Sequence, residues 1–240
     1  MKHLTIITSV ALVAFSCAAL SSLYVNEVTY SLRLDSVERP KEAKERWGEF
    51  AKLEVSEEKK YHYEDDLIDS YLVVLPDRIA FEIKNKTDHS IKLIWDDAAF
   101  IDLDGRASRI MHGGVKYVDR NASQPSSMIP AHGKFTDVIL PTDRIFYREG
   151  YYGTVVSQPG GWKHLALIQP QLELIRETSD ANVTVTDTLK ANATNNIGKK
   201  IGILLPLEIQ GTTNEYTFWF KVTDYRVLQP VATYKHPLFK

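Results

Sequence analysis

The chain has 240 residues, of which 44% are hydrophobic and 25% are charged, and its formal net charge is −2. This is an ordinary globular composition, because a domain of about 150 to 200 residues buries enough apolar surface to fold without disulfides. Its basic residues are dispersed among 31 acidic ones, so nucleic acid is not expected as a partner. The one cysteine, Cys17, excludes internal disulfides, four-cysteine zinc sites and iron–sulfur clusters.

The first residues have the pattern of a secretion signal. A short basic start, Met1–His3, precedes an apolar run of twelve residues from Leu4 to Phe15. A membrane-spanning helix needs about 20 apolar residues, whereas this run has the length of a signal-peptide core. Residues 1–16 are therefore predicted to be a signal peptide that takes no part in the fold.

Cys17 follows this signal within Val13-Ala-Phe-Ser-Cys-Ala18, which resembles the lipobox of bacterial lipoproteins. In that family the cysteine becomes the first mature residue and carries acyl chains such as palmitate. Family consensus has Leu at the position of Ala14. The alternative is that an ordinary signal peptidase cleaves after Ala19 or Ser21 and that Cys17 is discarded.

The lipobox resemblance implies a location and a partner. Two or three acyl chains attach a protein durably to a bilayer, whereas one holds it only reversibly. Acylated Cys17 would therefore tether the protein to the bacterial cell envelope. Ala18, in place of the Asp that favours inner-membrane retention in Gram-negative lipoproteins, implies the outer membrane, with the protein facing the periplasm or the exterior.

Residues 17–55 are predicted to be a lipid-anchored tether that passes into a strand and then into a short charged helix at Glu38–Phe50. Pro40 suits the first turn of that helix and Gly48 suits its exit.

The strongest strand signal lies between Arg78 and Met111. Apolar residues alternate with polar ones from Ile79 to Ile83 and again from Ile91 to Trp95, which is strand spacing with one buried face. A turn at Asp102–Gly105 leads into a third short run that ends at Met111. Three strands with local connections are typical of a β meander, on which the rest of the chain is expected to pack.

Five further strands are predicted, at Tyr71–Leu75, Lys134–Leu140, Ile145–Tyr147, Ile201–Ile209 and Tyr216–Val222.

The last two of these strands are predicted to form a hairpin. Pro206 argues that its strand lies at a sheet edge or carries a bulge. One or two helical turns are expected at Leu172–Glu177, and residues 178–198 are polar and look flexible.

Together these patterns predict a mainly β fold. Short strands with turns every eight to twelve residues indicate an antiparallel, immunoglobulin-like β-sandwich with minor short helices. This domain is assigned to residues 56–228, and residues 229–240 are assigned to a C-terminal tail. The Cys–Trp–Cys core of true immunoglobulins is absent.

The domain also resembles a group of bacterial lipoproteins that has no assigned activity. The likeness covers roughly half of the mature chain and implies the fold and the envelope location, without any chemistry. Its motifs are Tyr63-Glu-Asp65, Asn85-Lys-Thr87, Ile94-Trp-Asp96, Met111-His-Gly-Gly-Val-Lys-Tyr117 and Leu140-Pro-Thr-Asp143.

Four Asn-x-Ser/Thr sequons, at Asn85, Asn121, Asn182 and Asn192, mark expected surface positions.

Catalytic and metal-binding patterns are weak. No Gly-x-Ser-x-Gly elbow occurs, and the glycine pairs lack the context of phosphate-binding loops. His62 with Glu64, Asp65 and Asp66 has ligand chemistry, but calcium needs six or more converging oxygens. Asp102-x-Asp-Gly is better read as a hairpin whose Asp side chains cap the turn. No cofactor or metal is predicted.

An aromatic set is the best candidate for a binding surface. Five residues lie on or beside a glycine-rich loop, where rigid rings and a guanidinium can stack on a sugar, a peptide or a partner surface. Three residues on an earlier loop would be their neighbours if the two loops meet. The alternative is that these rings fold back to cover the core. The first group is Tyr147, Arg148, Tyr151, Tyr152 and Trp162, and the second is His112, Lys116 and Tyr117.

Three functional classes remain open. The first is a membrane-tethered, non-enzymatic binding or assembly module that recognises an envelope protein or a glycan through its loops. The second is a structural envelope protein without a small ligand. The third is a hydrolase or a metal-dependent enzyme, which a tight cluster of histidines and carboxylates in a pocket would favour.

Overall fold

A computed structural model describes residues 23–39, 52–55, 60–152, 157–176 and 186–234. This part of the chain is mainly strand and contains one α-helix. The strands are β1 (Leu23–Glu38), β2 (Lys52–Val55), β3 (Lys60–Glu64), β4 (Ile68–Val74), β5 (Ile79–Asn85), β6 (Ile91–Leu93), β7 (Ala99–Ile101), β8 (Ala107–His112), β9 (Ser127–Ile129), β10 (Lys134–Pro141), β11 (Ile145–Arg148), β12 (Tyr151–Tyr152), β13 (Ser157–Gln158), β14 (Gly161–His164), β15 (Leu172–Arg176), β16 (Lys200–Ile209) and β17 (Thr212–Tyr234). The helices are α2 (Asp187–Thr194) and the 3-10 turns η1 (Trp95–Asp97), η2 (Tyr117–Asp119) and η3 (Thr142–Arg144).

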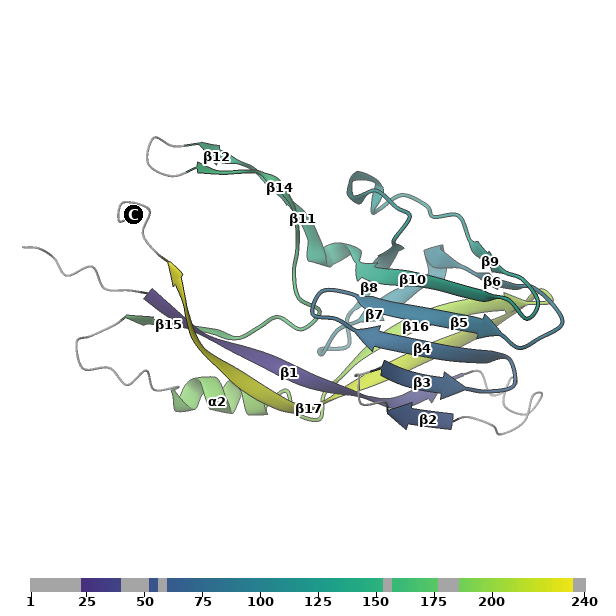
Figure 1. The fold of residues 1–240 in the computed structure, drawn as a ribbon, viewed down its shortest axis with the longest axis horizontal. Coiled ribbons are helices and arrows are strands. Elements are labelled where there is room, and N and C mark those ends of the chain that lie inside the picture. The colour runs from purple at the N-terminus through teal and green to yellow at the C-terminus, as the bar shows by residue number, and fades with distance from the viewer. Residues whose placement is uncertain (1–22, 40–51, 56–59, 153–156, 177–185, 235–240) are drawn as a thin grey trace, which may run out of the picture.

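The main sheet folds into two facing layers (Figure 1). Its strand order is β15-β1-β17-β16-β7-β8-β10-β5-β4-β3-β2, and its pairings are antiparallel. β8 joins the layers, because it pairs with β7 along one edge and with β10 along the other. The predicted mainly β, antiparallel architecture is therefore confirmed.

The core lies between β3–β5 on one side and β16–β17 on the other. Alternate residues of β5 are buried, as its period of two predicted, and β17 presents a matching aromatic face. Tyr63 of β3 meets Phe218 of β17 edge-on, with ring centroids 5.7 Å apart, and Tyr61 meets Phe220 at 5.4 Å. Burial of such side chains stabilises the fold by about 25 cal/mol per Å² of apolar surface.

A buried carboxylate connects β3, near one end of the strand order, to β1 and β17, near the other end. Asp65, in the turn after β3, is fully buried and accepts hydrogen bonds from the hydroxyls of Tyr63 (2.9 Å) and Tyr216 (3.0 Å). Arg39, directly after β1, forms an ion pair with the same carboxylate at 3.1 Å. Tyr61 of β3 also donates to the Leu32 carbonyl of β1. These contacts make the two-layer arrangement nearly closed.

The predicted meander is wrong in its connections. β5 pairs with β4 and β10, whereas β6 pairs with β16 and β9 in the other layer. Asn85 fixes the crossover, because its side-chain amide donates to the carbonyls of His89, Ile129 and Pro130. The turn at Asp102–Gly105 does form a hairpin, between β7 and β8.

Asn85 also corrects the prediction that all four sequons mark the surface. Its side chain is 0% exposed, since it forms those three hydrogen bonds in the core. Asn121 and Asn192 are exposed, and Asn182 lies outside the described residues.

Pro206 lies in a central strand, which corrects the predicted edge or bulge. β16 pairs with β17 in unbroken register and with β6 and β7 on its other side. Pro206 faces the gap between β6 and β7, where Ile94 donates its N–H to the Pro206 carbonyl at 3.1 Å. Proline has no N–H to donate to a neighbouring strand. None is needed at this point, because the neighbouring segment is the 3-10 turn η1.

Several other predicted elements can now be assigned. The strands predicted at Tyr71–Leu75, Lys134–Leu140 and Ile145–Tyr147 correspond to β4, β10 and β11, and the predicted C-terminal hairpin is β16–β17. The helical turns predicted at Leu172–Glu177 are wrong, because β15 pairs there with β1. The helix predicted at Glu38–Phe50 lies mostly outside the described residues.

Part of the segment predicted to be flexible forms α2. Thr186 caps this helix by accepting from the Leu189 N–H at 3.2 Å. Leu189 and Ala193 are buried against Val28 of β1, which supplies the tertiary contact that an eight-residue helix needs.

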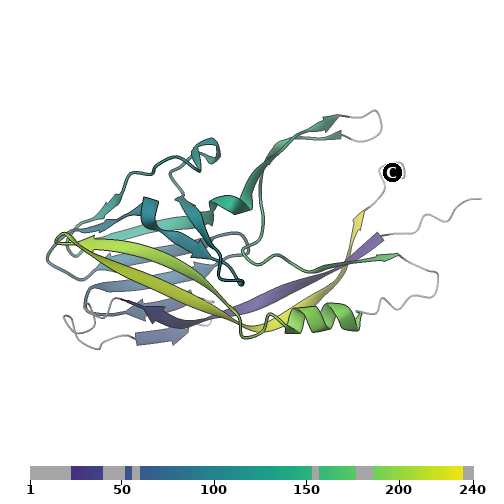
Figure 2. The same ribbon diagram turned by 180° about the vertical axis from the view of Figure 1, so that it is seen from behind.

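β1 and β17 extend beyond the two-layer body as a long paired ribbon, seen from both sides in Figures 1 and 2. β15 and α2 accompany this ribbon at its outer end. The strand pairing therefore includes residues 23–38 and 229–234, which the sequence pattern assigned to the tether and to the tail.

We predict that Asp65→Ala lowers the free energy of unfolding by about 3 to 5 kcal/mol, because Arg39 loses this buried ion pair and the buried Tyr63 and Tyr216 hydroxyls lose their shared acceptor. Urea denaturation followed by circular dichroism measures the change. Asp66→Ala removes the neighbouring, partly exposed carboxylate and serves as the control. An equal effect of the two substitutions would contradict the role assigned to Asp65.

Candidate functional site

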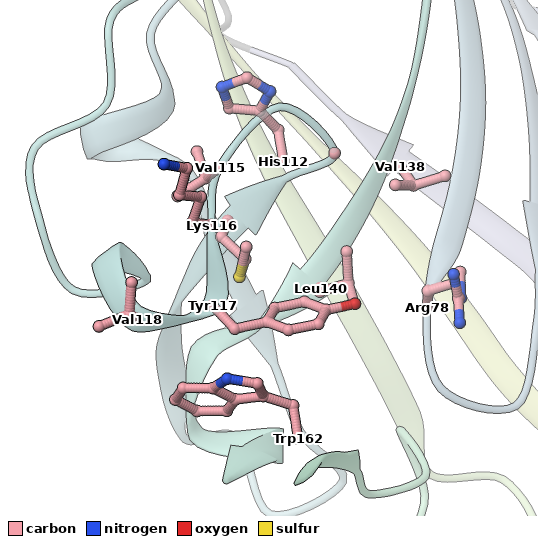
Figure 3. A pocket seen from close by; sticks show the side chains of 11 residues that line it. Arg78, His112, Val115, Lys116, Tyr117, Val118, Val138, Leu140 and Trp162 are labelled. Carbon is pink, nitrogen blue, oxygen red and sulfur yellow. The ribbon is translucent and has the colours of Figure 1, made fainter. Parts of the chain in front are cut away.

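A groove of about 450 Å³ lies where the loop after β8 meets β14. Its floor is apolar, with Met111 and Leu140 buried beside the partly buried Val138. Tyr117 from the loop and Trp162 from β14 form one wall, and their rings lie close together in Figure 3. Shape and lining are those of a shallow binding surface with aromatic walls.

The rings of this wall form a connected cluster. The Tyr117 and Trp162 centroids are 5.8 Å apart, and Tyr147 of β11 meets Trp162 edge-on at 5.5 Å. His164 meets Tyr117 edge-on at 5.0 Å. The two segments are thus in contact through Tyr117 and Trp162, which is the condition under which the sequence placed their residues on one surface.

Three basic side chains surround the groove. Arg78 and Lys116 line it, and the Tyr117 hydroxyl points toward Arg78 in Figure 3. The Arg120 guanidinium lies 5.0 Å from the Trp162 ring centre, a cation–π contact that fixes the indole plane. The wall is therefore both aromatic and positively charged.

The loop after β8 is held by two side chains. Gln124 is buried, donates from its side chain to the Ile110 carbonyl at 2.7 Å and accepts from the His112 N–H at 3.2 Å. Asp96 of η1 accepts from the Ser123 hydroxyl and from the Gln124 N–H. These bonds, the Ser123 bond foremost, lower the pKa of Asp96. Both ends of the loop are thereby tied to the body, which positions Tyr117.

His112 contributes less to the groove than its place in the sequence suggested. Its ring stacks on the buried Trp95 with centroids 4.6 Å apart and points away from Tyr117 in Figure 3. Its Nδ1 lies 3.0 Å from the Asp137 carboxylate and 3.3 Å from the Gly114 N–H. The first contact needs a proton on Nδ1 and the second needs Nδ1 without one. The contact with Asp137 is shorter and has a charged acceptor, so we assign Nδ1–H as a donor to Asp137. His112 thus serves mainly to pack the base of the loop.

Asp77, in the turn before β5, links the arginine of the groove to β14. Arg78 forms two hydrogen bonds with this carboxylate, at 3.0 and 2.7 Å, and His164 Nδ1 lies 2.9 Å from it. The Arg78 bonds, followed by the His164 bond, outweigh partial burial and lower the pKa of Asp77 to about 2. This pairing orients Arg78 and His164 beside Tyr117.

Four residues predicted to belong to the same surface do not line the groove, namely Tyr147, Arg148, Tyr151 and Tyr152; of these, Tyr147 contacts the lining residue Trp162. Arg148 donates to the Gln158 side chain at 2.7 Å, across the hairpin. Tyr151 and Tyr152 lie on β12, at the far end of the hairpin in Figure 1, and are 66% and 78% exposed. Cys17, the predicted lipid attachment site, lies outside the described residues.

Three of the residues considered as metal ligands have other partners in the structure. His62 Nε2 lies 2.8 Å from Asp69, and Asp65 belongs to the buried network. Asp102 accepts from the N–H groups of Asp104 and Arg106, both at 2.9 Å, and so caps the β7–β8 hairpin as predicted. Among the described residues, no group of three or more His, Cys, Asp or Glu side chains is placed to hold a metal ion.

Sequence reasoning missed four residues of the site, Asp77, Arg78, Arg120 and His164. The signal for Arg120 was its spacing of three from Tyr117, which a single 3-10 turn places on the same side; its guanidinium donates back to the Tyr117 carbonyl at 3.1 Å. Asp77 and His164 are 87 positions apart in the sequence, and no local sequence pattern predicts such a contact.

Among the described helices, none combines the length and the apolar character that crossing a bilayer requires. Comparison of the chain with protein-family models, with characterised proteins and with solved structures finds no match.

We predict that Asp77→Asn destabilises the protein at neutral pH by on the order of 1 to 2 kcal/mol. The folded pKa of about 2 lies below the unfolded value of 3.8, so this stabilisation is complete above pH 3.8 and is lost as the pH falls to 2. Urea denaturation from pH 2 to 5 should show the two proteins converging.

Asp119→Asn, which changes an exposed carboxylate of η2, is the control and should run parallel to the unchanged protein. A constant difference between Asp77→Asn and the unchanged protein down to pH 2 would show that the carboxylate charge is not the cause.

Proposed function

We propose that this protein is a lipid-anchored component of the bacterial cell envelope that binds a partner, without catalysis, in the groove at Tyr117 and Trp162. The observation that carries the binding proposal is the meeting of two loops, distant in sequence, around an apolar floor with aromatic and basic walls. Loops that are positioned by a rigid sheet are the usual place for recognition.

The anchor rests on the lipobox-like sequence. Cys17 is the one cysteine of the chain, and it stands directly after an apolar run of signal-peptide length. Two or three acyl chains there would hold the domain at the bilayer, and Ala18 favours the outer membrane. The lipid bilayer is thus the first partner of the proposal.

The groove is chemically suited to a glycan or to a peptide segment of an envelope protein. Indole and phenol faces stack on sugar rings and on apolar side chains, and Arg78 and Lys116 can donate to hydroxyl, carbonyl or carboxylate oxygens. The lining contains no Ser, Thr or Cys that His112 could activate as a nucleophile, which supports binding over hydrolysis.

A structural role without a small ligand is the second candidate. It is favoured by the packing of Tyr117 and Trp162 on the buried Met111, Leu140 and Ile145. In that case the rings only cover a small core, and the groove would stay empty.

The finer prediction of an immunoglobulin-like sandwich belongs to the same proposal. Facing antiparallel layers with long loops at their ends support it.

We expect Cys17→Ser to move the protein from the membrane fraction to the soluble fraction of the envelope, since no acyl chain can then be attached. Intact-mass analysis of the unchanged protein should show an acylated mature form that begins at Cys17. Ala14→Leu, which restores the lipobox consensus, is the control and should remain in the membrane fraction. A soluble mature chain that lacks Cys17 would exclude the anchor.

Site-specific photocrosslinking tests the groove. A benzophenone amino acid replaces Val118, which lies at the groove and is 69% exposed, or Thr213, an exposed residue near the β16–β17 turn. In cells, position 118 should give a discrete crosslinked product that position 213 lacks. Trp162→Ala should reduce that product about fivefold, whereas Trp162→Phe, which keeps a ring, should retain most of it. Equal labelling at both positions would favour the structural alternative.

A further inference from the structure

β11–β14 form an arm that stands away from the two-layer body (Figures 1 and 2). We call described residues 145–152 and 157–164 the aromatic arm. It consists of two separate two-stranded ladders, β11 with β14 and β12 with β13, and neither pairs with a third strand. Because an isolated two-stranded hairpin is at best marginally stable in water, such an arm is expected to have a partner surface.

Two glycines allow the arm to extend away from the body. Gly150 and Gly160 face each other between the two ladders, and a Cβ on Gly160 would lie 2.6 Å from the Gly150 nitrogen. Only glycine at both positions permits this close approach of the two backbones. The glycine pair thus continues the hairpin past the end of the first ladder, so that β12 and β13 lie beyond the body.

The arm exposes its tyrosine side chains more than the two-layer body does. Phe146 is 41% exposed, Tyr147 57%, Tyr151 66% and Tyr152 78%. In the body, Tyr71 is 42% exposed, and Tyr61, Tyr63 and Tyr216 are at most 4% exposed. Tyrosine, with an apolar ring and a polar hydroxyl, is the residue type that is enriched at the boundary between lipid and water.

The charges of the arm fit an anionic lipid surface. Arg148 and Lys163 are exposed on its paired strands, with Glu149 as the one acidic residue of the described arm. Basic side chains among aromatic ones are the usual composition of segments that lie in the headgroup region.

The position of the proposed anchor indicates that the partner of the arm is the lipid bilayer. The aromatic arm and the outer end of the β1–β17 ribbon point toward the same end of the long axis of the molecule (Figures 1 and 2). Leu23, the first residue of β1, lies at that end, six residues after Cys17. Six extended residues span at most about 20 Å, so an acylated Cys17 would hold this end of the protein near the bilayer.

We propose that the aromatic arm is a second membrane contact, in which Tyr147, Tyr151 and Tyr152 enter the headgroup region of the bilayer that holds the anchor. This inference rests on the proposed lipid anchor, which brings the arm to the membrane. Two contacts fix the orientation of a tethered domain, whereas an acyl anchor alone leaves it free to rotate. Since Tyr147 contacts Trp162, the membrane-bound arm would also hold the groove at a set height above the lipid.

Depth-dependent fluorescence quenching tests the arm without relying on acylation. A chain from residue 18 onward contains all the described residues and no cysteine. An N-terminal hexahistidine tag attaches it to nickel-chelating lipid in vesicles of phosphatidylethanolamine and phosphatidylglycerol. Tyr152→Cys or Thr213→Cys provides the single thiol for an NBD fluorophore.

Nitroxide-labelled lipid should quench the label at position 152 several-fold more than the label at position 213. Adding Tyr147→Ser and Tyr151→Ser to the Tyr152→Cys chain should lower this quenching to about the level at position 213, because less apolar surface then enters the lipid. Met128→Ser, at a residue that is 58% exposed on β9, is the matched control and should leave the quenching unchanged.

Equal, weak quenching at positions 152 and 213 would overturn the proposal. A second outcome would also overturn the proposal: the label at position 152 is shielded from water, and this shielding depends on protein concentration and not on lipid. The arm would then bind a second copy of the chain. The nickel lipid replaces the acyl chains, so a failed arm leaves the Cys17 anchor standing, and loss of the anchor in cells does not alter this measurement.

Discussion

The Asp65 carboxylate is buried at the point where strands from both layers approach each other, and each of its oxygens accepts at least two hydrogen bonds. Oδ2 accepts from Arg39, Tyr63 and Tyr216, and Oδ1 accepts from two backbone N–H groups of the following turn. Burial, reinforced by the Asp65 charge, raises the pKa of both tyrosine hydroxyls, so they stay protonated donors. A buried ion pair is weak evidence for net stability, but it allows only one register of the three strands that meet there.

The groove is positioned by another part of the sheet, around β8. β8 connects the layers, and the loop that follows it is tied back through Gln124 and Asp96. Tyr117 is thereby brought to Trp162, which belongs to β14, a strand that pairs with β11 alone among the described strands. The groove is therefore a junction between the rigid body and the aromatic arm, and its geometry depends on both.

Two parts of the chain extend beyond the two-layer core. The outer part of the β1–β17 ribbon packs against α2, while the aromatic arm carries exposed tyrosines. Both point toward one end of the molecule, and β1 begins at that end with Leu23. The proposed lipid anchor, the proposed membrane contact of the arm and the groove at the base of the arm would together let the protein bind its proposed partner close to a lipid surface.

The period-two patterns at Ile79–Ile83 and Tyr216–Val222 determined these two strands, because side chains that alternate between core and solvent are a local property of the backbone. The aromatic composition likewise singled out Tyr117, Tyr147 and Trp162. Pairing was decided only by the tertiary structure: β5 and β6 occupy different layers although they are adjacent in sequence.

The same limit applies to the site and to the core. Asp77 and His164, or Asp65 and Tyr216, meet across long stretches of chain, and no spacing in the sequence encodes such contacts. Asn85 had the pattern of a surface sequon, yet its amide is buried, because the carbonyls it binds are brought to it by β9 and the turn after it. Local periodicity is written in the sequence, whereas the partners of polar groups exist only once distant strands have packed.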